Sequence, residues 1–444
     1  MRIQLSDHFT YKRLLRFVLP SILMIICTSI YGVVDGFFVS NYTGKTAFAA
    51  VNLIMPILMI VGTMGTMVGT GGSAIVSKTM GEGDKELANK YFSMLIIAAF
   101  LIGTALSVIG FVFSGKIAIL LGATEALYDD TVLYGRIMFI FMPAFILQFA
   151  FQSFFAAAEK PSLSLTISIA AGIANAFLDW LFIAVLGWDI AGAALASGIG
   201  QFIGGIIPVI YFARKNNSLL RLTLKTKFYK KAFLRACSNG SSEMVTNIST
   251  SVVSILYNFQ LMKMAGENGI AAYGVIMYVN IIFMAVFLGY SIGSAPIVSY
   301  HYGSGNTGEL KNLFRKSLYI IGISGVFLTV LSEISAKPLA MIFANYDKEL
   351  LAMTVHGFRL YSLSFLIMGV NAWGSAFFTA LNNGIVSATI SFVRTFLFQI
   401  IAVLVLPLIL DLDGIWLAVD VAEILALIVT IIFFAKNKEE YQYI

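Results

Sequence analysis

Charged residues are scarce in this sequence. Asp, Glu, Lys and Arg make up 12% of the 444 residues, whereas hydrophobic residues make up 59% and the mean hydropathy is +0.88. Soluble globular domains contain about 25% charged residues. The scarcity therefore excludes a soluble domain and indicates a polytopic membrane protein.

Cysteine and histidine are nearly absent as well, with two and three residues. The isolated Cys27 and Cys237 indicate neither a disulfide framework nor a metal site, and the sequence offers no nucleophile and base for a membrane-embedded enzyme. The glycine-rich run at 62–72 favours helix packing, because no Gly-Lys-Ser/Thr of a phosphate-binding loop follows it. We therefore expect neither an enzyme nor a cofactor, and no metal other than a coupling Na⁺.

Long hydrophobic runs are abundant. A bilayer-spanning helix needs about 20 predominantly apolar residues, and twelve runs are long enough. The sequence thus predicts an all-α membrane protein with twelve transmembrane helices. The runs cover residues 13–40, 46–77, 88–113, 126–157, 162–186, 191–213, 232–263, 269–300, 309–335, 348–381, 385–409 and 413–435.

The basic residues predict the orientation. Lys and Arg gather at one set of helix ends, such as Lys12 and Arg13 before the first run and Lys436 and Lys438 after the last. The positive-inside rule then predicts that both termini are cytoplasmic, as an even helix count requires. The basic segment 214–231 has no acidic residue, and we interpret it as an anchor on anionic lipid head groups rather than a nucleic-acid site.

The chain contains an internal repeat of half its length. The segment IVSKTMGEGDKELANKYF from Ile75 matches IVSYHYGSGNTGELKNLF from Ile297 at an offset of 222 residues. Six helices per half make the halves parallel repeats, related by an axis along the membrane normal. We predict two six-helix bundles, 1–213 and 232–444, joined by a cytoplasmic linker, 214–231, and arranged in a V around a central cleft whose access alternates.

Polar residues in the first half indicate an ion site. Asn175 and Asp179 are four residues apart in an otherwise apolar run, so they lie on one helix face. An ionised Asp at the bilayer centre costs about 3 kcal/mol, which favours a functional role. Asp35 in the first run and Ser197 in the sixth extend the set. The second half has Tyr257, Leu397, Ile401 and Val419 at the equivalent positions.

Polar residues of the second half are harder to interpret. Glu243 lies near the cytoplasmic boundary, where water contact and a substrate role stay equally open. A pairing of Arg394 with Glu423 across the second bundle would neutralise both, while Asp420 has no assigned role.

In the first helix, Pro20 removes a backbone hydrogen bond and predicts a kink.

The ordered motifs resemble the multidrug and toxic compound extrusion (MATE) family of cation-coupled efflux transporters, in particular its bacterial twelve-helix members. The resemblance covers essentially the whole chain. It rests on LPSI and YGVVDGFFVS in the first helix, GSAIVSKTMGEGD after the second, N-x-x-x-D in the fifth, DIAGAALAS in the sixth and DGIWLAVDVAE in the twelfth.

The resemblance implies an antiporter in the bacterial inner membrane that exports lipophilic, mostly cationic drugs in exchange for H⁺ or Na⁺. It places the coupling-ion site at Asp35, Asn175, Asp179 and Ser197, with bending of the first helix at Pro20. A helix-10 carboxylate of some members has no counterpart here, and the nearest polar residue is Asn371. Candidate substrate-contacting or polar residues of the second bundle are Glu243, Tyr257 and Asn371.

We propose that the coupling ion and the exported organic cation compete for binding. Two carboxylates close together, Asp35 and Asp179, favour uptake of a proton or of Na⁺. Neutralisation would weaken the binding of an organic cation, for which aromatic and Met residues provide an adaptable apolar surface. Two self-complementary bundles predict a functional monomer.

Other functions fit the residues less well. A lipid-linked oligosaccharide flippase of a related two-bundle design would favour an Arg- and Lys-rich cleft and often has extra helices. A channel would need a selectivity element repeated in both halves. The flippase is the main alternative.

Overall fold

The computed structural model describes residues 3–223, 225–344 and 347–444. Within these ranges every regular element is a helix. In chain order they are α1 (Tyr11–Tyr42), α2 (Gly44–Gly81), α3 (Lys85–Leu120), α4 (Glu125–Ala157), α5 (Pro161–Asp179), the π-helix η1 (Trp180–Val185), α6 (Asp189–Ala213), α7 (Lys230–Gly303), α8 (Thr307–Ala344), α9 (Lys348–Ser362), α10 (Phe365–Ala380), α11 (Gly384–Phe392), the π-helix η2 (Val393–Leu397), α12 (Phe398–Val405), α13 (Pro407–Trp416) and α14 (Ala418–Tyr441).

The helices make twelve membrane-spanning units. Ten helices in the described ranges are long and apolar enough to cross a membrane. The 74-residue α7 contains two spans, because Gly266 (φ 61°, ψ −149°) breaks the helix between them. The bent pair α9 and α10 supplies one more span. The predicted number of transmembrane helices is therefore confirmed.

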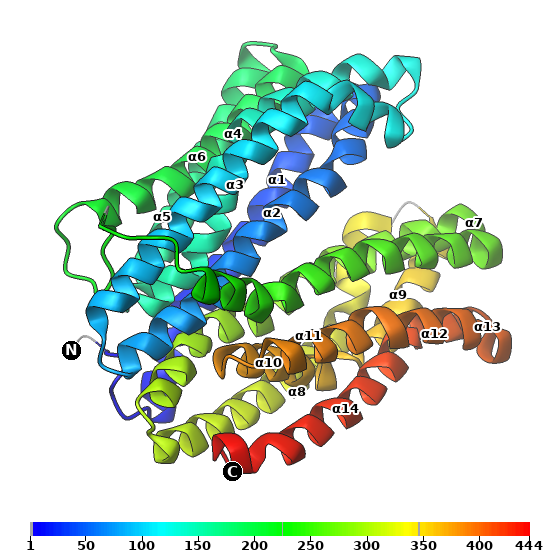
Figure 1. Ribbon diagram of the computed structural model, residues 1–444. Helices are drawn as coiled ribbons and strands as arrows, with labels where there is room; N and C mark the ends of the chain where they lie inside the picture. The colour runs from blue at the N-terminus through cyan, green and yellow to red at the C-terminus, as the bar shows by residue number, and fades with distance from the viewer. Residues whose placement is uncertain (1–2, 224, 345–346) are drawn as a thin grey trace.

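The spans form two bundles in a V (Figure 1). α1 to α6 make one bundle and α7 to α14 the other; both termini lie near the end where the bundles meet, and the bundles diverge toward the opposite end. The backbone confirms the internal repeat. Positive φ angles recur at the predicted offset of 222 or 223 residues, in the pairs Gly44 and Gly266, Gly83 and Gly305, Glu159 and Asn382, and Asp189 and Asp411.

The two hydrophobic cores repeat as well. In the first bundle Phe92 of α3 lies 5.1 Å, ring centroid to ring centroid, from Phe212 of α6. At the same offset in the second bundle, Phe314 of α8 lies 5.0 Å from Phe434 of α14. Edge-to-face aromatic pairs at such distances add about 0.5–1.5 kcal/mol beyond their buried area. Each bundle thus has its own aromatic centre at equivalent positions.

Glycines allow the bundles to touch at the end near the termini. A Cβ on Gly81 of α2 would clash with the Tyr300 carbonyl of α7, and a Cβ on Gly303 of α7 would clash with the Lys78 carbonyl of α2. Because these two contacts are related by the repeat, the bundles meet around a pseudo-two-fold axis. A small residue is required on both sides for the backbones to approach this closely.

A non-helical N-terminal segment, residues 3–10, with a turn at residues 5–7, crosses from one bundle to the other. The Leu5 N–H donates to Glu159 between α4 and α5 (2.7 Å), and the Phe9 N–H donates to Glu309 of α8 (2.9 Å). The second Glu309 oxygen contacts Nδ1 of His8 at 2.6 Å, and Lys316 donates to the Phe9 carbonyl at 2.7 Å. Leu5 and Phe9 are fully buried. We call residues 3–10 the N-terminal strap.

The linker between the bundles lies along α3. The Arg221 N–H donates to Asn89 (2.6 Å) and the Thr223 N–H donates to Ser93 (2.8 Å). The predicted bundle boundaries at 213 and 232 stay a prediction. Residue 224 of the predicted linker and residues 1–2 of the predicted first bundle lie outside the described residues.

Two spans differ from the sequence-based expectation. α1 is one continuous helix through Pro20, so bending at that residue stays a prediction for another state. The span predicted at 348–381 is bent by 50° between α9 and α10. The hydroxyl of Ser364 donates to the Tyr361 carbonyl (2.7 Å) and Thr329 donates to the Ser362 carbonyl (3.3 Å). These hydroxyls bond carbonyls at the end of α9, where the Tyr361 carbonyl also accepts from the Ser364 N–H (3.2 Å). The hydropathy pattern could not indicate this bend.

Candidate functional site

The predicted polar residues of the first half converge inside the first bundle. The Ser197 hydroxyl of α6 donates to Oδ1 of Asp35 on α1 at 2.9 Å. The amide of Asn175 on α5 lies 3.5 Å from the Ser197 hydroxyl, at the limit of a hydrogen bond. Asn175 and Asp179 are fully buried, and Asp35 is only 6% exposed. Three helices therefore bring two carboxylates, an amide and a hydroxyl to one enclosed place.

A small residue on α6 explains how α5 and α6 pack closely at this site. Gly200, one turn after Ser197, faces α5, where a Cβ would lie 3.1 Å from Cβ of Asn175. Small residues of this kind let α6 pack closely on α5. The α-helix ends at Asp179, and the π-helix η1 follows directly. Wide π turns inside helices often occur at functional sites.

Several oxygens at this site are unpaired. Within the described residues, neither carboxylate oxygen of Asp179 has a hydrogen-bond partner, and neither does Oδ1 of Asn175. Asp35 and Asp179 are close enough to interact electrostatically. Burying unpaired carboxylates is costly unless a proton or a cation neutralises them. Carboxylate, amide and hydroxyl oxygens together suit either a proton or a hard cation such as Na⁺.

Two tyrosines belong to the site but were not predicted from the sequence. Tyr31 and Tyr134 both lie within electrostatic range of Asp35 and Asp179, and Tyr134 is fully buried with its hydroxyl unpaired among the described residues. Tyr31 precedes Asp35 by four residues, so helical spacing could have placed it on the same face. Tyr134 is on α4, and no sequence signal connects it to the site.

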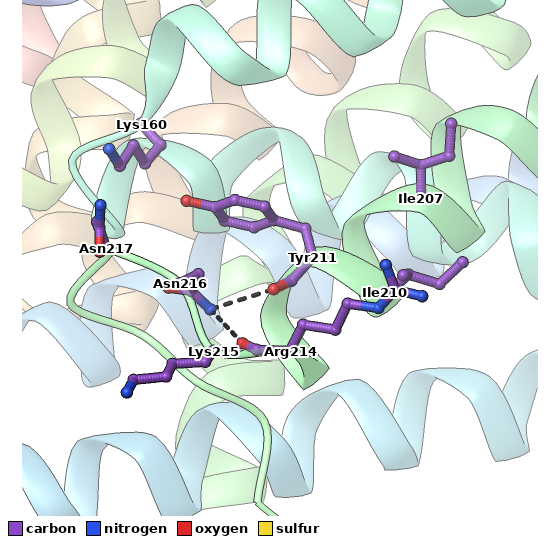
Figure 2. A pocket seen from close by; sticks show the side chains of 8 residues that line it. All are labelled: Lys160, Ile207, Ile210, Tyr211, Arg214, Lys215, Asn216 and Asn217. Carbon is purple, nitrogen blue, oxygen red and sulfur yellow. Dashed lines mark hydrogen bonds between the residues drawn. The ribbon is translucent and has the colours of Figure 1, made fainter.

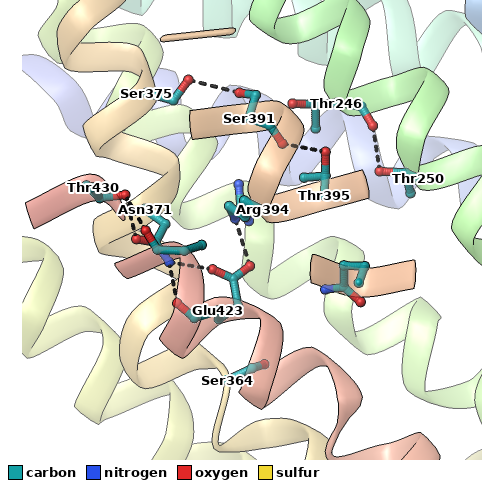
Figure 3. A network of polar contacts seen from close by, with 12 residues as sticks. Thr246, Thr250, Ser364, Asn371, Ser375, Ser391, Arg394, Thr395, Glu423 and Thr430 are labelled. Carbon is teal, nitrogen blue, oxygen red and sulfur yellow. Dashed lines mark hydrogen bonds and ion pairs between the residues drawn. The ribbon is translucent and has the colours of Figure 1, made fainter. Parts of the chain in front are cut away.

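The second bundle contains a buried polar network (Figure 3). Nε of Arg394 on η2 donates to Oε1 of Glu423 on α14 at 2.7 Å, and Asn371 of α10 donates to Oε2 of Glu423 at 2.8 Å. Thr430 donates to the Asn371 side-chain oxygen at 3.0 Å. The predicted pairing of Arg394 with Glu423 is confirmed, and both residues lie in the second bundle.

The other candidates of the second bundle lie apart from the first site. Glu243 on α7 is partly buried and has Arg394 as its charged neighbour. The Tyr257 hydroxyl donates to Oε1 of Gln399 at 3.2 Å, and its ring stacks on Tyr273 at 4.9 Å. Tyr257 is the repeat equivalent of Asp35, so the second bundle has a neutral group where the first has a carboxylate.

Among the described residues, Asp420 is a second buried carboxyl whose oxygens have no hydrogen-bond partner. It is 8% exposed. Across the same described ranges, no three His, Cys, Asp or Glu residues are grouped so that they could hold a metal ion. Asp420 thus matches Asp179 in burial but lacks a neighbouring set like that of Asp35, Asn175 and Ser197.

Comparisons with known proteins agree with this architecture. The MatE family model matches residues 20–181 and 243–405, one segment in each repeat. The chain is similar to the Multidrug export protein MepA of Staphylococcus haemolyticus (strain JCSC1435), with 25% identity over 409 residues and 89% of each chain covered. MepA of Staphylococcus aureus (strain MRSA252) is 23% identical over 81% of this chain and 79% of its own. The crystal structure of MATE in complex with MaL6 superposes with a TM-score of 0.93, 18% identity and 98% of each chain covered.

Proposed function

The chain belongs to the MATE family of efflux transporters, and on that premise we propose that it exports lipophilic, mostly cationic drugs or toxic compounds in exchange for H⁺ or Na⁺. The similar MepA proteins are named multidrug export proteins. The observation that supports ion coupling is the buried group of Asp35, Asn175, Asp179 and Ser197, whose unpaired oxygens need a proton or a cation.

Coupling takes place in the first bundle. When Asp35 and Asp179 are both ionised, their negative charge favours an organic cation near this bundle. Uptake of H⁺ or Na⁺ removes that charge, so the ion and the drug compete and the ion gradient drives export. The second bundle contributes less, because Glu423 is already neutralised by Arg394 and hydrogen-bonded by Asn371. Glu243, Tyr257 and Asn371 remain candidate substrate-contacting residues.

The proposed transport mechanism also requires a defined orientation of the protein in the membrane. The protein is a multi-pass membrane protein of twelve spans; we place it in the bacterial inner membrane as a monomer, with both termini cytoplasmic. The bundles 1–213 and 232–444 then meet on the cytoplasmic side and diverge toward the outside (Figure 1). Alternating access requires the bundles to separate at the cytoplasmic end, where the glycine contacts and the N-terminal strap now join them.

Transport in proteoliposomes tests the proposed function. We expect an imposed pH gradient or an imposed Na⁺ gradient to drive ethidium movement by the purified protein, and the gradient that does so identifies the coupling ion. An ionophore that collapses the gradient should stop this movement. If neither gradient drives ethidium, the antiporter proposal fails, and flipping of a fluorescent lipid-linked substrate becomes the next measurement.

Weakening the strap should favour separation of the bundles at that end. Glu309→Ala removes the acceptor of the Phe9 N–H and the partner of His8. A hydrogen bond to a charged group is worth about 2 kcal/mol, so the ratio of separated to joined states should rise about thirtyfold. Spin labels at the exposed Lys85 and Lys311, one in each bundle, measure the change. In electron paramagnetic resonance, the population with the longer distance between the labels should increase.

The matched control for the strap is Glu86→Ala. Glu86 is exposed and pairs with Lys90 on its own helix at 2.7 Å, so its removal leaves the bundle contact intact. Equal distance distributions in the Glu309 and Glu86 variants would show that the strap does not hold the bundles together.

A further inference from the structure

A basic pocket lies at the end of α6, outside the ion site and its coupling mechanism. It has a volume of about 480 Å³ and is lined by Lys160 before α5 and by Arg214 and Lys215 after α6, together with apolar and amide side chains. Among the residues that the structure describes, none of these three basic residues forms an ion pair with a carboxylate. The pocket therefore has positive charge that the protein itself does not neutralise.

The floor of the pocket is continuous with the membrane-facing surface of α6. Ile207 and Ile210 line it and are 43% and 44% exposed. They lie three residues apart on a membrane-spanning helix, on the same side, where acyl chains contact the protein. The Tyr211 ring also lines the pocket, and tyrosine is enriched at the level of lipid head groups. A ligand here therefore meets both cations and an apolar surface.

Figure 2 shows how the pocket is arranged. Lys160 lies on the side toward which the Tyr211 hydroxyl points, and the Arg214 side chain extends toward Ile210. The loop is held in place, because the Asn216 amide donates to the carbonyls of Tyr211 (3.1 Å) and Arg214 (3.0 Å). These two hydrogen bonds tie the loop at Asn216 to the end of α6.

We propose that this pocket binds the head group of an anionic glycerophospholipid. The phosphodiester interacts with Lys160 and Arg214, and the acyl chains lie along Ile207 and Ile210. Basic pockets at the cytoplasmic end of membrane helices recognise anionic head groups in this way. A free phosphate would use only the cations, whereas a lipid also covers the apolar floor, so the lining favours the lipid.

Native mass spectrometry of the purified full-length protein tests the proposal, with phosphatidylglycerol as the probe. The double variant Lys160→Gln/Arg214→Gln should bind phosphatidylglycerol about tenfold more weakly than the wild type. The control variant Lys311→Gln/Arg315→Gln removes the same charge from exposed positions of α8, outside both the pocket and the basic segment 214–231. Its affinity should stay within about twofold, because these side chains do not line the pocket. Phosphatidylcholine and inorganic phosphate should bind weakly to all three proteins.

Three results would overturn the proposal. Equal losses in the two variants would show diffuse attraction by surface charge rather than binding in the pocket. Unchanged affinity in the Lys160 and Arg214 variant would place the lipid elsewhere. Phosphate binding as tight as lipid binding, and lost in the pocket variant, would make this a soluble-phosphate site. If the double variant misfolds, Arg214→Gln alone replaces it, with Arg315→Gln as its control.

Discussion

Asp35→Asn and Asp179→Asn should each reduce ion-driven ethidium export to the rate of protein-free vesicles. Either change removes a carboxylate that would accept the coupling ion, while the amide keeps nearly the same size and can still donate or accept hydrogen bonds. The two carboxylates interact with each other, so losing one also changes how the other binds a proton or Na⁺. Export driven by the active gradient in proteoliposomes measures the effect.

The matched control is Asp420→Asn in the second bundle. Asp420 resembles Asp179 in chemistry, in burial and in having no hydrogen-bond partner among the described residues. The same substitution there should leave gradient-driven export near the wild-type rate. A loss in all three variants would show that coupling involves both bundles, and full export in the Asp35 and Asp179 variants would make the first-bundle group structural.

Glu423→Gln should be the most destabilising of the polar substitutions. Arg394 and Glu423 are 8% and 1% exposed and make a 2.7 Å charged hydrogen bond. Removing one partner of a buried ion pair typically costs about 3–5 kcal/mol, because the other charge stays buried without compensation. The midpoint of thermal unfolding in detergent should therefore fall well below that of the wild type.

The exposed pair of Arg359 and Glu333 provides the comparison. These residues are 56% and 39% exposed and 3.7 Å apart, and such pairs contribute about 0–1 kcal/mol. Glu333→Gln should barely change the unfolding midpoint. The double variant Arg394→Met/Glu423→Gln should lose less stability than the two single variants added together, because it removes both charges of the buried pair. Equal shifts for Glu333→Gln and Glu423→Gln would contradict the role assigned to the buried pair.

The sequence did not determine the bend between α9 and α10 or all the partners of Arg394. Composition and hydropathy indicated the twelve spans, but not the 50° bend between α9 and α10, because hydroxyl groups that bond carbonyls leave no hydrophobic pattern. The charge pattern indicated Glu423 as the partner of Arg394, but not that Asn371 and Thr430 extend this pair into a network. Spacing along a chain shows which residues share a helix face, whereas partners on different helices depend on how those helices cross.

By itself, the sequence determined that the chain spans a membrane twelve times, that its halves repeat, and that the unusual buried acids Asp35 and Asp179 lie in the first half. Hydropathy, periodicity and repeat offset are properties of the chain, so they need no tertiary contact. Only the tertiary structure decided that Ser197 reaches Asp35, that Tyr31 and Tyr134 join them, and that residues 3–10 connect the two bundles. These contacts depend on close packing between helices far apart in the sequence, where a single glycine sets how near two backbones approach.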